Sequence, residues 1–70
     1  MESIEIPKPT VTIGEIRAKY KLTQKEFASS IGVSAQTVSA WEKDIYTISP
    51  KNLLNIYIKY GVNSIELLGV

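Results

Sequence analysis

The sequence contains no cysteine and no histidine. Without cysteine there can be no disulfide bond and no thiolate metal site, and without histidine the commonest general base and metal ligand is missing. No hydrophobic run approaches the roughly 20 residues of a membrane span, and the first ten residues lack the basic and apolar regions of a signal peptide. We therefore expect a cytoplasmic protein that is neither an enzyme nor a membrane protein and that needs no metal, other cofactor or small-molecule ligand.

Charge is also scarce, since the net charge of the 70-residue chain is only +1. The distribution of charge along the chain is more informative than the net charge. Residues 17–43 carry five cations and two anions, whereas residues 1–16 are net negative and residues 44–70 are balanced. The positive charge is therefore concentrated in the middle of the chain, and clustered cations favour an anionic partner.

Helix-starting signals recur along the chain. Thr12 and Thr23 are each followed by glutamate three residues later, as in a capping box, and Asn63 begins a weaker version. Ser34 is a good N-cap, and Ser49 precedes a proline at the first helical position. Gly32 and Gly61 suit the left-handed position after a helix. These signals predict five short helices, over residues 12–20, 23–30, 34–43, 49–60 and 63–68.

Apolar residues recur at helical spacing in four of these segments. The predicted buried positions are Ile13, Ile16, Tyr20, Phe27, Ala28, Ile31, Val38, Trp41, Leu53, Ile56, Tyr57 and Tyr60. Trp41 shares its stripe with Val38, which favours a core position over stacking on a nucleic acid. Because each segment is too short to be a stable helix alone, all five must share one core.

The first eleven residues follow a different pattern. Ile4 and Ile6 alternate with polar residues, and Pro7 and Pro9 then interrupt the alternation. We expect residues 1–11 to form an extended or flexible arm, and residues 12–70 to form the folded domain.

The second and third helices are separated only by Ile31-Gly32-Val33-Ser34. A turn this tight, with glycine in the left-handed conformation, makes two helices cross steeply, and Ala28 is small where they would approach. This is the layout of a helix-turn-helix, which presents its second helix to the major groove of DNA.

From about residue 12 to residue 68 the sequence resembles the phage-repressor-like family of the Cro/repressor type, also called XRE-like. The matching residues are Ile16-Arg17, Leu22-Thr23-Gln24, Phe27-Ala28, Ile31-Gly32-Val33-Ser34, Val38-Ser39, Trp41-Glu42, Ser49, Leu53-Leu54, Ile56, Gly61-Val62 and Ile65 to Leu68. The resemblance implies an all-α, compact five-helix domain of the lambda-repressor-like type, with its helix-turn-helix at helices 2 and 3.

The resemblance also implies roles for individual residues. The positions that would contact DNA bases are Ser34, Ala35, Gln36, Ser39 and Ala40, and those that would contact phosphates are Gln24, Lys25, Thr37 and Lys43. Arg17 and Glu42 match a structural ion pair between the first helix and the end of the third. Gln36 has the chemistry to pair with adenine or guanine, and the Ala35 methyl has the chemistry to meet a thymine methyl.

The chain departs from the family pattern after Glu42. The family usually continues with Asn-Gly and basic residues, whereas this chain has an apolar segment, with Asp44 in place of the glycine. An exposed apolar segment can be a binding surface. We therefore expect either local packing of this segment, with Ile58 as one contact, or a protein interface formed by Ile45, Tyr46, Ile48 and Ile58.

Two functions follow from these observations. The first is a sequence-specific DNA-binding transcriptional regulator, such as a phage or mobile-element repressor, that binds double-stranded DNA either as a single copy or as a homodimer. The alternative is a protein-binding modulator or antirepressor, which would use the same fold to inhibit another regulatory protein. The apolar 45–48 segment and the neutral side chains of the third helix favour the alternative.

Overall fold

The computed structural model describes residues 8–69, which form five α-helices and one 3-10 helix. The helices are α1 (Ile13–Tyr20), α2 (Gln24–Ser30), α3 (Ala35–Lys43), the 3-10 helix η1 (Ile45–Thr47), α4 (Pro50–Tyr60) and α5 (Ser64–Leu68). No strand occurs between residues 8 and 69, so the predicted all-α fold is confirmed. Each predicted helix begins one residue early because the prediction included the N-cap residue.

All five predicted N-cap residues cap their helices. In each case the side-chain oxygen accepts a hydrogen bond from the backbone N–H three residues later, and these residues are Thr12, Thr23, Ser34, Ser49 and Asn63. The capping boxes at Thr23 and Asn63 are complete. The predicted box at Thr12 is only half formed, because the Glu15 carboxylate accepts from the Thr12 hydroxyl rather than from its backbone N–H.

The capping box of α2 also affects the ionisation of Glu26. Hydrogen bonds from the backbone N–H of Thr23, and then from its side chain, lower the pKa of the Glu26 carboxyl. A lowered pKa in the folded state means that the carboxylate stabilises the fold at neutral pH. That contribution is lost as the pH falls through the lowered pKa.

Both predicted glycines follow a helix in the left-handed conformation. Gly32, after α2, has φ +76°, and Gly61, after α4, has φ +73°. A β-carbon at Gly32 would meet no atom within 4 Å, so the need for glycine there comes from backbone conformation and not from space. Lys21, after α1, also has a positive φ of 56°, which the sequence did not indicate.

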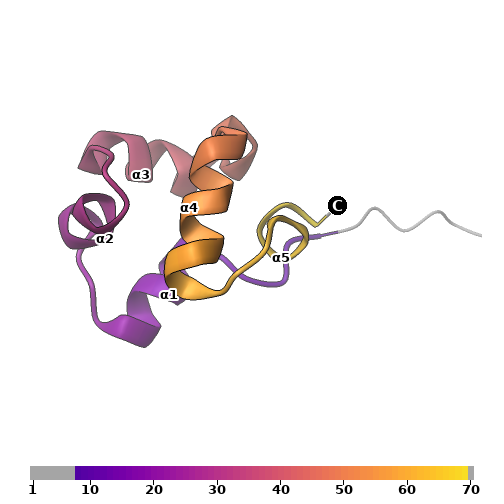
Figure 1. Ribbon diagram of the computed structural model, residues 1–70, viewed down its shortest axis with the longest axis horizontal. Coiled ribbons are helices and arrows are strands. Elements are labelled where there is room, and N and C mark those ends of the chain that lie inside the picture. The colour runs from indigo at the N-terminus through magenta and orange to yellow at the C-terminus, as the bar shows by residue number, and fades with distance from the viewer. Residues whose placement is uncertain (1–7, 70) are drawn as a thin grey trace, which may run out of the picture.

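Figure 1 shows how the helices are arranged. In this view α4 runs vertically in front, α2 and α3 lie behind and beside it, and α1 lies below. Helix α5 lies at the opposite side of the domain from α2, next to the described N-terminal residues. The chain thus surrounds a core to which every helix contributes apolar side chains.

The core is a single cluster of nine buried side chains, namely Ile13, Ile16, Phe27, Ala28, Val38, Trp41, Ile48, Ile56 and Leu67. Seven of these were predicted, including Trp41. Two predicted positions were wrong: Tyr57 is 55% exposed and Tyr20 is 46% exposed. Both residues occupy the margins of their apolar stripes, where a bulky ring extends past the core into solvent. The Tyr20 ring instead contacts the ring of Tyr60.

The apolar 45–48 segment packs mostly inward. Ile48 is only 8% exposed and belongs to the core, and Ile45 is partly buried against it. Assigning Ile48 to a protein interface was therefore wrong, because its side chain is already covered by its own chain. Ile58, the suggested contact of this segment, is 72% exposed, so the segment does not pack over it. Tyr46 is exposed, but its hydroxyl donates a hydrogen bond to the backbone oxygen of Leu68.

The described part of the N-terminal arm lies against α5. The backbone N–H groups of Thr10 and Val11 both donate to the oxygen of Glu66. A β-carbon at Gly69 would lie 2.6 Å from the backbone of Lys8, so only glycine permits this close approach. The remainder of the predicted arm, residues 1–7, lies outside the described residues. Within residues 8–69 no helix combines the length and hydrophobicity that crossing a bilayer requires.

The different exposures of two isoleucines lead to a stability prediction. Replacing Ile48 with alanine would leave a cavity in the core, and we expect the free energy of unfolding to fall by about 2–5 kcal/mol. Replacing the exposed Ile58 with alanine serves as the matched control, and we expect a change within about 0.5 kcal/mol. Urea denaturation measures both. Equal losses in the two variants would contradict the buried position of Ile48.

Candidate nucleic-acid interface

The turn between α2 and α3 is fixed by backbone hydrogen bonds. The oxygen of Ala28 accepts from the N–H groups of both Ile31 and Val33, and the oxygen of Ser29 accepts from Gly32. Ala28 itself is buried, as expected for a small residue where two helices approach closely. These bonds set the angle at which α3 leaves the turn.

Helix α3 has one buried face and one open face. Val38 and Trp41 pack into the core, whereas Gln36, Ala40 and Lys43 are exposed. The three exposed residues recur at i, i+4 and i+7, so they form a continuous row on the side opposite the core. Among the other predicted base-contacting residues, Ser34 is exposed, and Ala35 and Ser39 are intermediate in exposure. The predicted set therefore occupies one accessible side of α3 and its N-terminus.

Two of the predicted DNA-contacting side chains bind each other. The Ser34 hydroxyl accepts from the backbone N–H of Thr37, and the two hydroxyl groups lie 2.9 Å apart. A hydroxyl has one donor and two acceptor positions, so this pair retains some capacity for a further partner. The hydrogen bonds between Ser34 and Thr37 also stabilise the N-terminus of α3.

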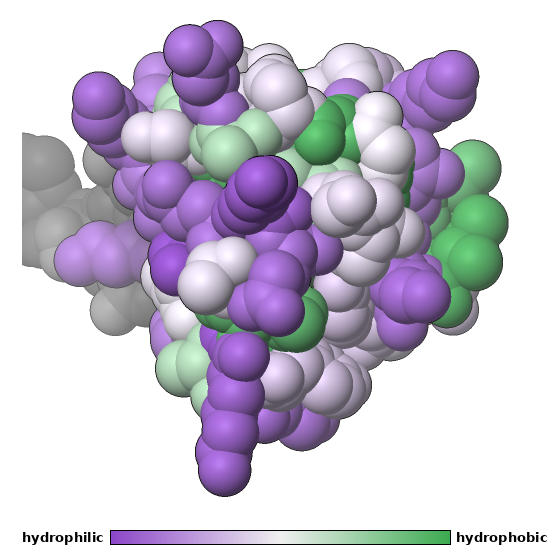
Figure 2. Space-filling model, turned by 90° about the vertical axis from the view of Figure 1, so that its left-hand side faces the viewer, coloured by the Kyte–Doolittle hydropathy of each residue, from purple (hydrophilic) through white to green (hydrophobic). Residues whose placement is uncertain are grey.

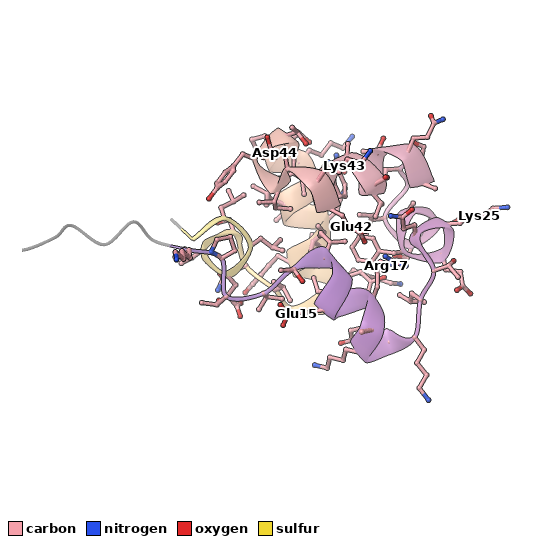
Figure 3. All side chains as sticks on the ribbon, turned by 180° about the vertical axis from the view of Figure 1, so that it is seen from behind. Glu15, Arg17, Lys25, Glu42, Lys43 and Asp44 are labelled. Atoms are coloured by element: carbon pink, nitrogen blue, oxygen red, sulfur yellow. The ribbon has the colours of Figure 1, made fainter. Side chains whose placement is uncertain are left out.

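Glu42 connects three helices from its position near the end of α3. Its Oε1 accepts from Arg17 Nη1 of α1 at 2.6 Å, and its Oε2 accepts from Gln24 Nε2 of α2 at 2.9 Å. Figure 3 shows Arg17 and Glu42 pointing toward each other between α1 and α3. Arg17 also donates through Nε to the backbone oxygen of Leu22. One carboxylate therefore holds α1 and the start of α2 against α3.

The bond between Gln24 and Glu42 adds a structural role to a residue that was predicted to contact phosphate. An amide side chain has two N–H donors and one acceptor oxygen. The bond to Glu42 uses one N–H and orients the rest of the group. Nothing in the sequence pattern indicates that Glu42 is the partner of Gln24, because the two residues are 18 positions apart in the chain.

Two lysines flank this region at opposite ends. Lys25 lies in the first turn of α2 and Lys43 in the last turn of α3, and both are exposed. Figure 3 shows Lys25 pointing away from the body of the domain. Figure 2, which views the side of the domain where α2 lies, shows a mainly hydrophilic surface. Lys25 and Lys43 thus supply the positive charge here, while Gln36 and Ala40, the other members of the exposed row of α3, are neutral.

Asp44 has a role that explains why it replaces the family glycine. Its side chain accepts from the backbone N–H of Tyr46, and its backbone oxygen accepts from the N–H and the hydroxyl of Thr47. Its φ of −151° is extended, so glycine is not required. Asp44 therefore caps η1 and directs Ile45 and Ile48 toward the core. An aspartate at a turn is a known capping signal, so the sequence itself contains an indication of this turn.

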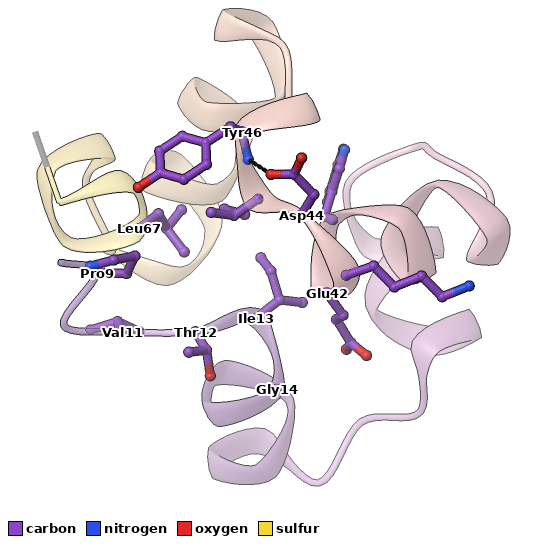
Figure 4. Close-up of a pocket in the computed structure, with 12 residues that line it drawn as sticks. Pro9, Val11, Thr12, Ile13, Gly14, Glu42, Asp44, Tyr46 and Leu67 are labelled. Atoms are coloured by element: carbon purple, nitrogen blue, oxygen red, sulfur yellow. Dashed lines mark hydrogen bonds between the residues drawn. The ribbon is translucent and has the colours of Figure 1, made fainter.

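A cavity of about 460 Å³ lies beside the end of α3. Its walls come from Pro9 and Val11, the start of α1, the segment from Trp41 to Tyr46, and Leu67 of α5. Figure 4 shows Tyr46 and Leu67 on one side of it and Ile13 on another. The described residues contain no group of three or more acidic side chains that could hold a metal ion.

Comparison with known families decides the classification. A helix-turn-helix family model matches residues 13–67, which span nearly all of the described helices. The chain belongs to the helix-turn-helix family of Cro/repressor type. Members of this helix-turn-helix family are DNA-binding regulators, and the family match therefore supports DNA as the partner of this protein. Searches of curated proteins and of solved structures gave no significant match.

The geometry around Glu42 leads to a second prediction, tested by a double-mutant cycle. The side chains of Arg17 and Glu42 are 25% and 24% exposed. Their coupling should therefore lie between that of exposed and fully buried pairs, at about 1–2 kcal/mol. We expect Arg17→Ala and Glu42→Ala each to lower the free energy of unfolding, and the double variant to lose less than the sum.

The control for this cycle is ionic strength. Added salt screens a partly exposed ion pair, so the coupling measured by urea denaturation should shrink at high salt. Strictly additive losses at low salt would show that the two residues do not stabilise each other.

Proposed function

We propose that this protein is a sequence-specific transcriptional repressor that places α3 in the major groove of duplex DNA. The observation that carries the proposal is the two-sided character of α3. Val38 and Trp41 bury its inner face in the core, and its outer row of Gln36, Ala40 and Lys43 is exposed to solvent. Repression would be steric, as in phage and mobile-element switches, because the bound domain would cover a promoter.

The outer row has the chemistry of direct base readout. A glutamine side chain can bind adenine through two hydrogen bonds, and an alanine methyl can pack on the methyl group of thymine. Gln36 would supply the first contact, with Ser39 beside it, and Ala35 and Ala40 would supply apolar contacts. Ser34, at the start of the helix, would complete the set of base-contacting residues.

Contacts with the DNA backbone would fix the position of α3. We assign them to Gln24, Lys25, Thr37 and Lys43, which lie at the beginnings of α2 and α3 and at the end of α3. Such contacts supply affinity without reading sequence. The network around Glu42 supports this arrangement because it orients the Gln24 amide relative to α3.

The alternative function, a modulator that binds another regulator, loses part of its support. The apolar 45–48 segment was the main reason to consider it, and Ile45 and Ile48 pack against the protein's own core. The neutral row on α3 fits base contacts as well as a protein surface. DNA binding therefore accounts for more of the observations.

Salt-dependent DNA titration tests the proposal. Affinity for duplex DNA should fall as salt rises, because each neutralised phosphate releases counterions. Lys25→Ala and Lys43→Ala should each reduce the slope of log K against log salt by about 1. Lys59→Ala, on α4, is the control and should leave the slope unchanged. If no duplex binds at low salt, the proposal is wrong.

Gln36 provides the test of sequence readout. After selection of a cognate site from random duplexes, Gln36→Ala should weaken binding to that site by about 1–3 kcal/mol. Its affinity for unrelated DNA should change little, because a base contact contributes only at the cognate sequence. A fluorescence anisotropy titration with both duplexes measures the difference. Equal losses on both would rule out base reading by Gln36.

A further inference from the structure

Helix α1 ends at a left-handed residue that is not glycine. Among residues 8–69, three glycines have a positive φ, namely Gly32, Gly61 and Gly69, which follow α2, α4 and α5. The remaining residue with a positive φ is Lys21, which ends α1 with φ 56° and ψ 47°. A side chain makes this conformation unfavourable, because the β-carbon approaches the following carbonyl oxygen. The chain therefore has a lysine at a position where three of its other helices use glycine.

The fold requires the backbone conformation of Lys21 but not its side chain. The backbone N–H groups of Lys21 and Leu22 donate to the oxygens of Ala18 and Arg17, and these bonds end α1. Leu22 then packs against the core, while the connection to α2 runs along the edge of the domain in Figure 1. Glycine at this position would allow the same backbone bonds, and Lys21 is exposed. The packing of the domain therefore gives no reason for the lysine.

The surroundings of Lys21 in the chain are positively charged. Residues 17–26, which we call the α1–α2 corner, carry four cations and one anion. Arg17 is held in the ion pair with α3, and the Lys19 ammonium lies 5.5 Å from the centre of the Tyr20 ring. Within residues 8–69 the Lys21 ammonium has no ion-pair partner and lies over no aromatic ring. It is therefore a cation that is available to a partner, in a part of the surface that attracts anions.

We propose that Lys21 binds a backbone phosphate of the DNA duplex that α3 reads, and that this contact accounts for the lysine at a strained position. Lys21 lies three residues before Gln24, so their α-carbons are at most about 11 Å apart. Gln24 is oriented toward α3 by Glu42 and is itself assigned to a phosphate. A lysine ammonium has three donors on a flexible stem of four carbons, which suits a neighbouring phosphate group. This inference rests on the proposed function.

The strain at Lys21 separates a binding role from a structural one. Unfavourable backbone conformations persist where the surrounding structure holds them, and they cluster at functional sites. A purely structural role would be interaction with the negative end of the α1 dipole. Arg17 and Lys19 already place two cations in the last turn of α1, so Lys21 is not needed for that purpose. The two roles predict opposite changes when glycine replaces Lys21, because glycine removes the strain and the charge together.

The variant Lys21→Gly tests the contact through two measurements on the purified full chain. Glycine relieves the left-handed strain, so we expect the melting temperature to rise by several degrees. On the duplex selected with the natural chain, we expect binding to weaken severalfold at low salt. The slope of log K against log salt should fall by about 1. A more stable protein that binds DNA less tightly is the result expected for a strained contact residue.

Two matched variants separate a local contact from the net charge of the α1–α2 corner. Lys21→Arg keeps both the charge and the strain, so its salt slope should equal that of the natural chain. Lys19→Ala removes the same charge two residues away, where the ammonium already lies over the Tyr20 ring, and should leave the slope unchanged. An equal decrease in slope for Lys19→Ala and Lys21→Gly would overturn the contact, because net charge alone would explain it. An unchanged slope for Lys21→Gly would also overturn it, and a lowered melting temperature would then assign Lys21 to the α1 dipole.

Replacing single phosphates of the selected duplex locates the contact. Each duplex carries one methylphosphonate group, which has no charge, in place of a phosphate. At one position we expect the natural chain to bind severalfold more weakly, and Lys21→Gly to bind as well as to the unmodified duplex. If every replacement weakens both proteins by the same factor, the contact does not exist, although DNA binding by the natural chain still supports the proposed function. If the natural chain binds no duplex at low salt, the proposed function fails and the contact fails with it.

Discussion

The short length of the helices is the constraint on which the rest of this structure depends. The longest described helix, α4, has 11 residues, and isolated helices shorter than about 12–15 residues are marginal in water. Their stability must come from the shared cluster around Phe27, Val38 and Ile56. A core this small gives the domain only modest stability, since a domain of this size buries only about 60% of the surface that its unfolded chain exposes. Each helix cap and each buried side chain therefore contributes a significant part of the total free energy of unfolding.

The same constraint ties the exposed row of α3 to the core. Because Val38 and Trp41 are buried on one side of the helix, Gln36 and Ala40 are held on the other with little freedom to rotate. The Glu42 carboxylate adds a polar restraint to α1 and α2. A rigid support of this kind reduces the entropy lost when side chains bind a partner. Stability and the proposed base reading thus depend on the same packing.

The segment after α3 shows how a departure from the family pattern is accommodated. In place of a polar, glycine-containing loop, Asp44 caps η1 and the apolar residues turn inward. Ile48 thereby becomes part of the core. Large apolar side chains that remain exposed lie mostly on other elements, namely Leu54, Tyr57 and Ile58 on α4, Ile65 on α5 and Tyr20 on α1, with Tyr46 in η1 itself.

The sequence by itself determined the helices and their order, because caps, glycines and apolar spacing act over three or four residues. It placed the starts of the five α-helices to within one residue, although not that of η1, and it identified the family through motifs that extend along most of the chain. The tertiary structure alone decided which apolar residues are covered. Tyr57 is exposed and Ile48 is buried because of the way α4 and the segment after η1 pack against the core. A local sequence pattern does not contain that information, because the packing involves residues far apart in the chain. The partners of Glu42 were likewise settled by the packing of three helices, since Arg17 and Gln24 come within hydrogen-bonding distance only when α1, α2 and α3 share one core.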